Sequence, residues 1–131
     1  MTRQKNQRER LWEETAGHCI YCGHPVTLEE MEVDHITPLS RGGENELDNK
    51  VCACSSCNAE KANLPLEEFL QKKLSHKQLL RYRNRLDALI QQHRLPWEKA
   101  DRLYPREEEA DPSLPPRQDF VLIRIALPAW L

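Results

Sequence analysis

The chain has 131 residues and a net charge of −2, with 39% hydrophobic and 31% charged residues, which fits one small domain whose core is of limited size. No stretch approaches the roughly 20 consecutive apolar residues of a membrane span, and no apolar signal core follows the charged N-terminus, so we expect a cytoplasmic protein without a membrane partner. The small net charge excludes a uniformly basic surface, but the charges are unevenly spread, because the segment 72–94 is rich in Lys and Arg and contains one acid, Asp87.

The N-terminal part predicts a helix and then a strand. Residues 3–16 carry Leu11 among charged residues and stop at Gly17, which is typical of a helix that ends in a glycine C-cap. Residues 31–36 alternate between apolar and polar side chains, as a half-buried strand does. This strand should end before Pro38, because proline has no N–H to donate to a ladder.

A second strand and a helix follow. Residues 41–49 are polar and contain two glycines, which predicts a loop. Residues 50–54 form a second short apolar run, and Ser55 or Ser56 can cap a helix that runs to about Ala62. The predicted arrangement is a β-hairpin followed by a helix.

The cysteines predict a metal site. Five cysteines are an odd number in a chain without a secretion signal, which argues against a disulfide framework. Two Cys-x-x-Cys pairs provide four thiolates for a tetrahedral ion, so we expect a structural Zn²⁺ on Cys19, Cys22, Cys54 and Cys57. Such an ion would stabilise a domain whose composition leaves its core weak.

Other roles are conceivable for the residues near these pairs. A redox role for one Cys-x-x-Cys pair is possible in principle, but a second pair without a βαβ pattern favours zinc. Cys52 lies in an apolar run, and we interpret it as a small buried hydrophobic residue. His18 and His24 flank the first pair as potential substitute ligands, but four cysteines already complete the coordination, which favours surface histidines.

The segment between the two pairs is longer than the roughly 15 to 20 residues of a compact zinc module, which indicates that something is built within it. It reads Val-Asp-His-Ile-Thr-Pro-Leu-Ser-Arg-Gly-Gly at 33–43 and Asp-Asn-Lys at 48–50, and Cys-Ser-Ser-Cys-Asn-Ala-Glu-Lys follows at 54–61. Over roughly residues 10–70 the chain resembles an HNH endonuclease of the ββα-metal fold, and it is similar to the HNH domain of CRISPR effector nucleases. The resemblance implies an α+β fold whose ββα-metal core is stapled by a structural zinc and flanked by helices.

The resemblance also implies an active site. His35 is the expected general base, and Asp34 and Asn58 are expected to hold a catalytic Mg²⁺ or Mn²⁺ through oxygen ligands. Asn49 corresponds to the family residue that shapes the loop and helps to orient the histidine. Asn58 departs from the family name, which expects a second histidine there, and this leaves the choice of metal in question.

Simple geometry adds expectations about these residues. Neighbours on a regular strand face opposite sides, so Asp34 and His35 share a site only if the strand breaks at His35. Asn58 and Lys61 share a helix face, so we expect Lys61 to contact phosphate beside the cation. Cys57 lies about 100° around the helix from Asn58, which puts the two metals on different faces.

The C-terminal half predicts two more helices. Pro65 begins a short helix that runs through about Lys72, and a capping box with a hydrophobic staple begins at Leu74 and Ser75 and opens a longer helix to about His93. The apolar face of the longer helix comprises Leu79, Tyr82, Leu86, Leu89 and Ile90. Tyr82 and Trp97 are expected to pack rather than to stack on bases.

Charge along the longer helix suggests a nucleic-acid contact. Lys77, Arg81 and Arg85 recur every four residues, which is typical either of a solvated basic face or of one that binds phosphate. Together with Arg41 and Lys61 they form our predicted DNA-binding set.

Residues 105–117 read as a Pro-rich acidic linker, and Phe120 to Leu127 has strong β-propensity. A lone strand is not stable in water, so it must pair with this domain, a second copy or a protein partner. We therefore divide the chain into an N-terminal helix (1–17), a nuclease core (18–72), a basic helical extension (73–104) and a linker with a strand (105–131).

The sequence thus predicts a metal-dependent DNA endonuclease. One alternative is a nucleic-acid-binding module, in which the two zinc-binding cysteine pairs and the basic helix bind nucleic acid while the His35 site has no catalytic activity. The other is a subunit of a larger defence, phage or mobile-element assembly that does not cleave independently. A plasmid-nicking assay with Mg²⁺ separates the enzyme from the binding module, and a sizing column tests the assembly.

Overall fold

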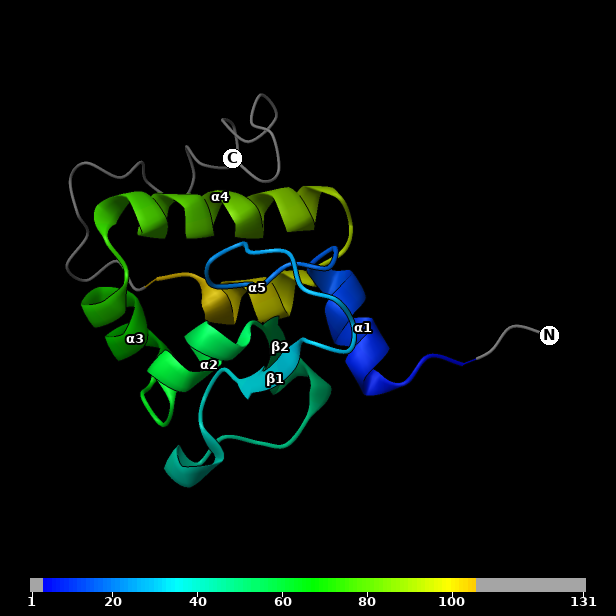
Figure 1. Cartoon of the computed structure of the whole chain (residues 1–131), viewed down its shortest axis with the longest axis horizontal. Coiled ribbons are helices and arrows are strands. Elements are labelled where there is room, and N and C mark those ends of the chain that lie inside the picture. The colour runs from blue at the N-terminus through cyan, green and yellow to red at the C-terminus, as the bar shows by residue number, and fades with distance from the viewer. Residues whose placement is uncertain (1–3, 106–131) are drawn as a thin grey trace.

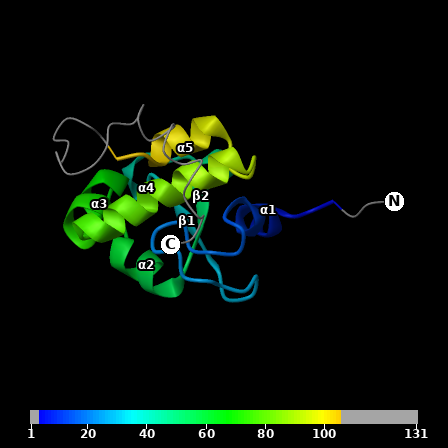
Figure 2. The same ribbon diagram turned by 90° about the horizontal axis from the view of Figure 1, so that it is seen from above.

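The structure is a computed structural model and describes residues 4–105. In chain order its elements are α1 (Gln7–Glu14), β1 (Glu32–His35), β2 (Lys50–Ala53), α2 (Ser55–Lys61), α3 (Leu66–Lys73), α4 (His76–Gln91) and α5 (Trp97–Leu103). The helices surround a small sheet, with α1 and α3 on opposite sides of it in both ribbon views (Figures 1 and 2). This is the small α+β fold that the sequence predicts.

The sheet is one antiparallel hairpin. Glu32 pairs with Ala53 and His35 pairs with Lys50, so both strands are four residues long. One further hydrogen bond, from the N–H of Ile36 to the carbonyl of Asn49 at 2.8 Å, holds the strand ends together before Pro38. The predicted hairpin and the helix after it are confirmed.

The cap of α2 differs from the prediction. The N-cap is Cys54, whose sulfur accepts the N–H of Cys57 at 3.4 Å, and Ser55 and Ser56 are exposed in the first turn. A cysteine sulfur takes the place of the usual oxygen because this residue also belongs to the cysteine cluster. One of the predicted metal ligands is therefore also the helix cap.

The starts of α3 and α4 follow the predicted rules, whereas the end of α1 does not. Helix α1 is shorter than predicted, and its C-cap is Thr15 rather than a glycine; Ala16 and Gly17, which follow, have positive φ values of 54° and 77°. Helix α3 begins directly after Pro65. Helix α4 has the predicted capping box, in which Ser75 and Gln78 exchange hydrogen bonds.

The main core is continuous from the first cysteine pair to α5. It contains Tyr21, Phe69 and Tyr82, and it reaches Leu103 and Tyr104 at the end of the described chain. A smaller cluster under α1 contains Leu11, Met31 and Cys52, which confirms that Cys52 is a buried apolar residue.

Two aromatic predictions have different outcomes. Tyr82 is fully buried, as predicted, and its hydroxyl donates to the carbonyl of Leu103. The packing prediction for Trp97 is only partly right: its ring contacts that of Tyr104 at 6.5 Å between centroids, but 52% of its surface is exposed at the start of α5.

The predicted acidic linker beyond Pro105 and the predicted strand at 120–127 lie outside the described residues. Among the helices that the structure describes, none combines the length and apolar character needed to cross a bilayer.

Candidate functional site

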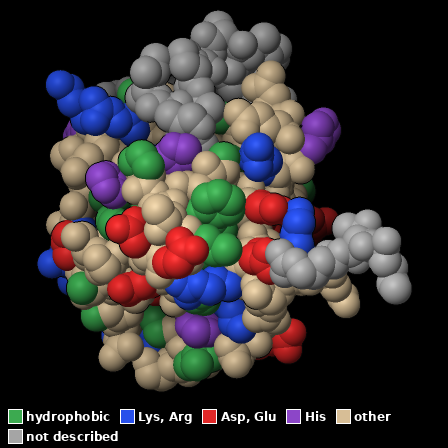
Figure 3. All heavy atoms as spheres, turned by 45° about the vertical axis from the view of Figure 1, so that its right-hand side comes forward, with side chains coloured by type: hydrophobic (Ala, Val, Ile, Leu, Met, Phe, Trp, Pro, Cys, Tyr) green, Lys and Arg blue, Asp and Glu red, His purple; other side chains and the backbone are tan. Residues whose placement is uncertain are grey.

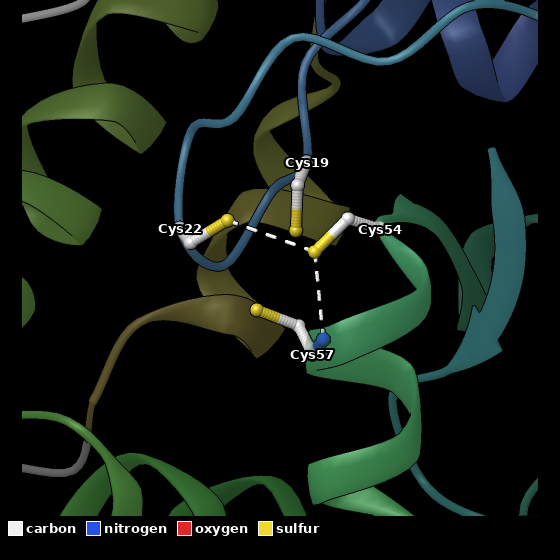
Figure 4. Close-up of side chains that lie close together, drawn as sticks. All are labelled: Cys19, Cys22, Cys54 and Cys57. Atoms are coloured by element: carbon white, nitrogen blue, oxygen red, sulfur yellow. Dashed lines mark hydrogen bonds between the residues drawn. The ribbon is translucent and has the colours of Figure 1, made fainter. Parts of the chain in front are cut away.

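Four cysteines from two distant segments meet in one cluster. Cys19 and Cys22 come from the loop after α1, and Cys54 and Cys57 come from the start of α2. Their sulfurs point toward one another (Figure 4) and all lie within 4.8 Å of one another. The predicted ligand set is therefore assembled, and it can hold a metal ion.

The backbone of each pair supports its sulfurs. The N–H of His24 donates to Sγ of Cys22 at 3.4 Å, as the N–H of Cys57 does to Sγ of Cys54. The hydrogen bond between Cys19 and Cys22 raises the pKa of the Cys19 thiol to about 12 and lowers the pKa of Cys22. A bound cation would favour four thiolates.

A buried arginine lies against this cluster. Arg85, which was predicted on an exposed stripe with Lys77 and Arg81, is only 4% exposed, so that prediction is wrong for Arg85. A Cβ added to Gly23 would lie 2.6 Å from its Nη2, which places the guanidinium against the first cysteine loop. Burial lowers the pKa of Arg85, while its electrostatic interaction with Cys19 and the other cluster cysteines opposes this shift. The side chain therefore brings positive charge to the cysteines.

The second candidate site is an open pocket of about 390 Å³ between the hairpin and α2. Asp34 and His35, at the end of β1, line it together with Asn58 from the first half of α2. His35 is the last residue of β1 and still pairs with Lys50, so the predicted break of the strand at His35 is not seen, although both residues border one pocket. Cys57 and Asn58 serve different sites, because their side chains leave the helix in different directions.

Asp34 is almost completely buried, with 5% of the residue exposed. Its Oδ2 accepts the hydroxyl of Tyr21 at 2.5 Å and lies 3.1 Å from Nζ of Lys61. Burial raises the pKa of Tyr21 well above its usual value, and the charge of Asp34 adds to this, so the hydroxyl stays protonated and donates.

Lys61 does not occupy the place predicted for it. It shares a helix face with Asn58, but its side chain has no exposed surface, and Nζ also donates to the carbonyl of His35 at 2.7 Å. A direct contact between Lys61 and phosphate is therefore excluded in this arrangement. The reason is that the burial of Asp34 requires a cation within the protein.

The ring of His35 is oriented by a residue that the sequence analysis missed. Nε2 of His35 lies 3.1 Å from Oδ1 of Asn45. An amide oxygen only accepts hydrogen bonds, so Nε2 carries the proton and Nδ1 holds the lone pair. Asn45 lies in a polar loop, where nothing in the sequence distinguishes it from its neighbours.

Asn49 organises this loop from inside. Its Oδ1 accepts the N–H of Thr37 at 3.0 Å, and its Nδ2 donates to the carbonyls of Thr37 and Glu44 at 3.0 and 2.7 Å. Glu44 precedes Asn45, so Asn49 fixes the segment that contacts His35. A further donor, Nη2 of Arg102 in α5, lies 3.0 Å from Oδ1 of Asn49.

Asn58 is also held in one orientation. Its Nδ2 donates to Oε1 of Glu32 at 2.7 Å, which leaves the amide oxygen as the atom available to a ligand. With Asp34, the pocket offers oxygen donors, the type that hard divalent cations prefer. Glu32 was not predicted, since it is one of several acidic residues before the Asp-His pair.

The exposed basic residues do not form one patch. Arg41 is exposed next to Ser40, which lines the pocket, and its Nε donates to the carbonyl of Asn63 at 2.7 Å. Lys77 and Arg81 are exposed on α4, along the top of Figure 1, whereas the segment that joins β1 to β2 lies at the bottom. The face in Figure 3 mixes Lys and Arg with Asp and Glu.

Comparison with known proteins bears on this site. Residues 19–64 match the model of the HNH endonuclease family. The chain is 44% identical over 48 residues to the CRISPR-associated endonuclease Cas9 of Corynebacterium diphtheriae, and 36% identical over 55 residues to that of Actinomyces naeslundii. These matches cover 36% and 41% of this chain, but only 4% and 5% of the relatives.

Solved structures agree. The type II-C Cas9 enzyme from Actinomyces naeslundii superposes with a TM-score of 0.57 and 26% identity, covering 75% of this chain and 11% of that one. Streptococcus thermophilus Cas9 in complex with the AGAA PAM gives a TM-score of 0.60 over 88% of this chain and 11% of that one; at 22% identity this likeness shows the fold alone. The chain thus spans a small part of each relative.

Proposed function

Since residues 19–64 match the model of the HNH endonuclease family, we propose that this chain is a metal-dependent endonuclease that hydrolyses the phosphodiester bonds of DNA. The observation that carries the proposal is the open pocket that Asp34, His35 and Asn58 line together. Hydrolysis needs a base for water, a cation and a place for the phosphate, and this pocket has candidates for all three.

Asp34 and Asn58 would hold the divalent cation, Mg²⁺ or Mn²⁺, through one carboxylate oxygen and one amide oxygen. The carboxylate uses Oδ2 for Tyr21 and Lys61, and the amide nitrogen is engaged by Glu32, so both side chains retain an oxygen for a ligand. A bound cation supplies charge neutralisation for the phosphate and the departing oxygen. The pocket volume of about 390 Å³ leaves room for water and phosphate oxygens.

His35 would act as the general base. Its Nδ1 would take a proton from water, and the resulting hydroxide would attack phosphorus. The bond from phosphorus to the leaving oxygen would break, and that oxygen would depart with the electron pair and take a proton from solvent. Asn45 keeps the ring in the tautomer that this requires. Asn49 acts as a positioning residue, since it holds the backbone beside Asn45.

Lys61 contributes by neutralising Asp34 and by bonding the carbonyl of His35, rather than by touching the substrate. For DNA contacts we propose Arg41, which is exposed beside the pocket, and the exposed pair Lys77 and Arg81. The buried Arg85 serves the cysteine cluster instead.

For the cysteine cluster we propose a structural Zn²⁺. Sulfurs about 2.3 Å from a tetrahedral ion lie about 3.8 Å apart, and Sγ of Cys22 and Cys54 are separated by 3.7 Å. Four cysteine ligands leave no open position for catalysis, which assigns the cluster to folding.

A nicking assay on supercoiled plasmid with Mg²⁺ or Mn²⁺ tests the proposal. His35→Ala should keep its fold and DNA affinity while cleavage falls by about 10² or more. Asp34→Ala and Asn58→Ala should regain part of their activity at high cation concentration, because each removes one ligand.

Binding without any nicking across these cations would contradict the proposal for the isolated chain. That result would favour the binding module or the subunit of a larger assembly.

A further inference from the structure

Tyr21 links the two candidate metal sites. It lies between Cys19 and Cys22 in the first cysteine pair, and its hydroxyl donates to Oδ2 of Asp34 at 2.5 Å. One side chain therefore spans the distance from the cysteine cluster to the carboxylate of the cation pocket.

The ring of Tyr21 has little freedom to move. It is fully buried, with an edge-on contact to Phe69 (5.1 Å between centroids, 66° between planes) and a stacked contact to Tyr82 (6.3 Å, 20°). Because the two flanking cysteines fix its backbone and these rings fix its side chain, the position of the hydroxyl is set by the cluster and the core.

This hydroxyl determines which oxygen Asp34 offers. Both described contacts of the carboxylate, from Tyr21 and from Lys61, use Oδ2. A carboxylate held by two donors on one oxygen cannot rotate without losing both bonds. Oδ1 is consequently the oxygen left for a cation in the pocket that Asp34 lines.

We propose that Tyr21 is a positioning residue that couples the cysteine cluster to the cation site by fixing the carboxylate of Asp34. The inference rests on the cation role of Asp34 proposed above. It adds that the cysteine cluster does more than hold the fold together, since an ordered first cysteine pair raises the affinity of the pocket for its cation. Coupling of this kind is reciprocal, so a bound cation also stabilises the cluster.

Tyr21→Phe and Tyr82→Phe provide a matched test. Each removes one hydroxyl from the same buried aromatic group, but the hydroxyl of Tyr82 donates to the carbonyl of Leu103 and not to Asp34. Both are made in a His35→Ala background, so that no cleavage is needed for the measurement. Mn²⁺ affinity is measured by calorimetry, and the visible absorption of Co²⁺ bound to the cysteines reports whether the cluster is intact.

We expect Tyr21→Phe to weaken Mn²⁺ binding by about tenfold or more while the Co²⁺ absorption is retained. Tyr82→Phe should stay within about twofold of its parent. Unchanged Mn²⁺ affinity in Tyr21→Phe would overturn the inference, as would an equal loss in both variants or the absence of Mn²⁺ binding by the parent. Cleavage by the chain with His35 intact is measured separately, and its failure would count against the proposed function only.

If Tyr21→Phe loses the Co²⁺ absorption, the cysteine cluster of the variant is not intact. The coupling between the cluster and the cation site is then tested by a second measurement on the unmodified chain. Saturating Mg²⁺ should slow the reaction of the cluster cysteines with a thiol reagent by about threefold or more, because the coupling is reciprocal. An unchanged rate would overturn the inference.

Discussion

Nζ of Lys61 lies 3.1 Å from Oδ2 of Asp34, and the two side chains are 0% and 6% exposed. The ammonium group of a residue predicted to touch the substrate is thus enclosed within the protein. A buried pair of this kind makes each partner costly to remove, because the remaining charge has no solvent to stabilise it.

Lys61→Met should therefore lower the free energy of unfolding by about 3 to 5 kcal/mol, measured by urea denaturation. Lys72→Met is the control, since Lys72 forms an exposed pair with Glu68 at 3.3 Å and its removal should cost less than about 0.5 kcal/mol. Equal and small losses in the two variants would show that Lys61 is not needed to neutralise Asp34.

A substitution at Gly23 tests the contact between the first cysteine pair and Arg85 of α4. Gly23 and Gly42 both have positive φ values, of 79° and 86°, so alanine at either position should cost about 1 to 2 kcal/mol of backbone strain. At Gly42 an added Cβ meets nothing within 4 Å, whereas at Gly23 it would lie 2.6 Å from Nη2 of the buried Arg85. Gly23→Ala should therefore lose more stability than Gly42→Ala, and it should retain its metal less tightly.

Thermal unfolding with metal analysis after dialysis measures both effects. Equal losses in the two glycine variants would mean that Arg85 moves aside without cost and does not support the cysteines.

The metal content gives a third prediction. Purified protein should contain about one Zn²⁺ per chain, and Cys54→Ser should lose it together with cooperative unfolding, because Cys54 is both ligand and N-cap of α2. Cys52→Ser should keep the metal, since Cys52 packs with Leu11 and Met31. Elemental analysis measures the zinc content of both variants. Loss of zinc from Cys52→Ser together with its retention by Cys54→Ser would refute the ligand assignment.

The exposed basic side chains give a fourth prediction. Changing Lys77 and Arg81 together to Gln should weaken binding to all DNA sequences alike, and it should flatten the plot of log affinity against log salt by about 0.9 for each phosphate that the protein no longer neutralises. Arg41→Gln should act in the same direction and by about 0.9. An unchanged slope for the double variant would identify this part of α4 as a solvated surface.

Sequence rules for the ends of helices and strands predicted the secondary structure well. Pro38 and the Ser75 capping box act through their immediate neighbours, so the sequence suffices to place the strand end and the start of α4. The two Cys-x-x-Cys pairs lie far apart in the chain, and their shared preference for one metal ion predicted the cluster. The motif that includes Asp34 and His35 likewise indicated a shared pocket, which the structure confirms.

The environment of each side chain was less predictable. Lys61, Arg85 and Asn45 look like ordinary surface residues in the sequence, because burial and hydrogen-bond partners depend on segments far along the chain. Arg85 satisfies the four-residue spacing of a surface stripe, yet the packing of α4 against the first cysteine pair encloses it. Periodicity identifies a helix face, but tertiary packing decides how much of that face reaches water.

The bond from Arg102 to Asn49 limits how small a working fragment of this chain can be made. The segment that matches the family ends at residue 64, whereas the guanidinium that supports the loop beside His35 comes from α5. Many side chains of the main core also lie beyond residue 64, among them Phe69, Tyr82 and Leu103. A truncated protein for crystallisation or for grafting into another nuclease should therefore retain everything through α5, because shortening it to the matched segment would expose apolar surface and release the loop.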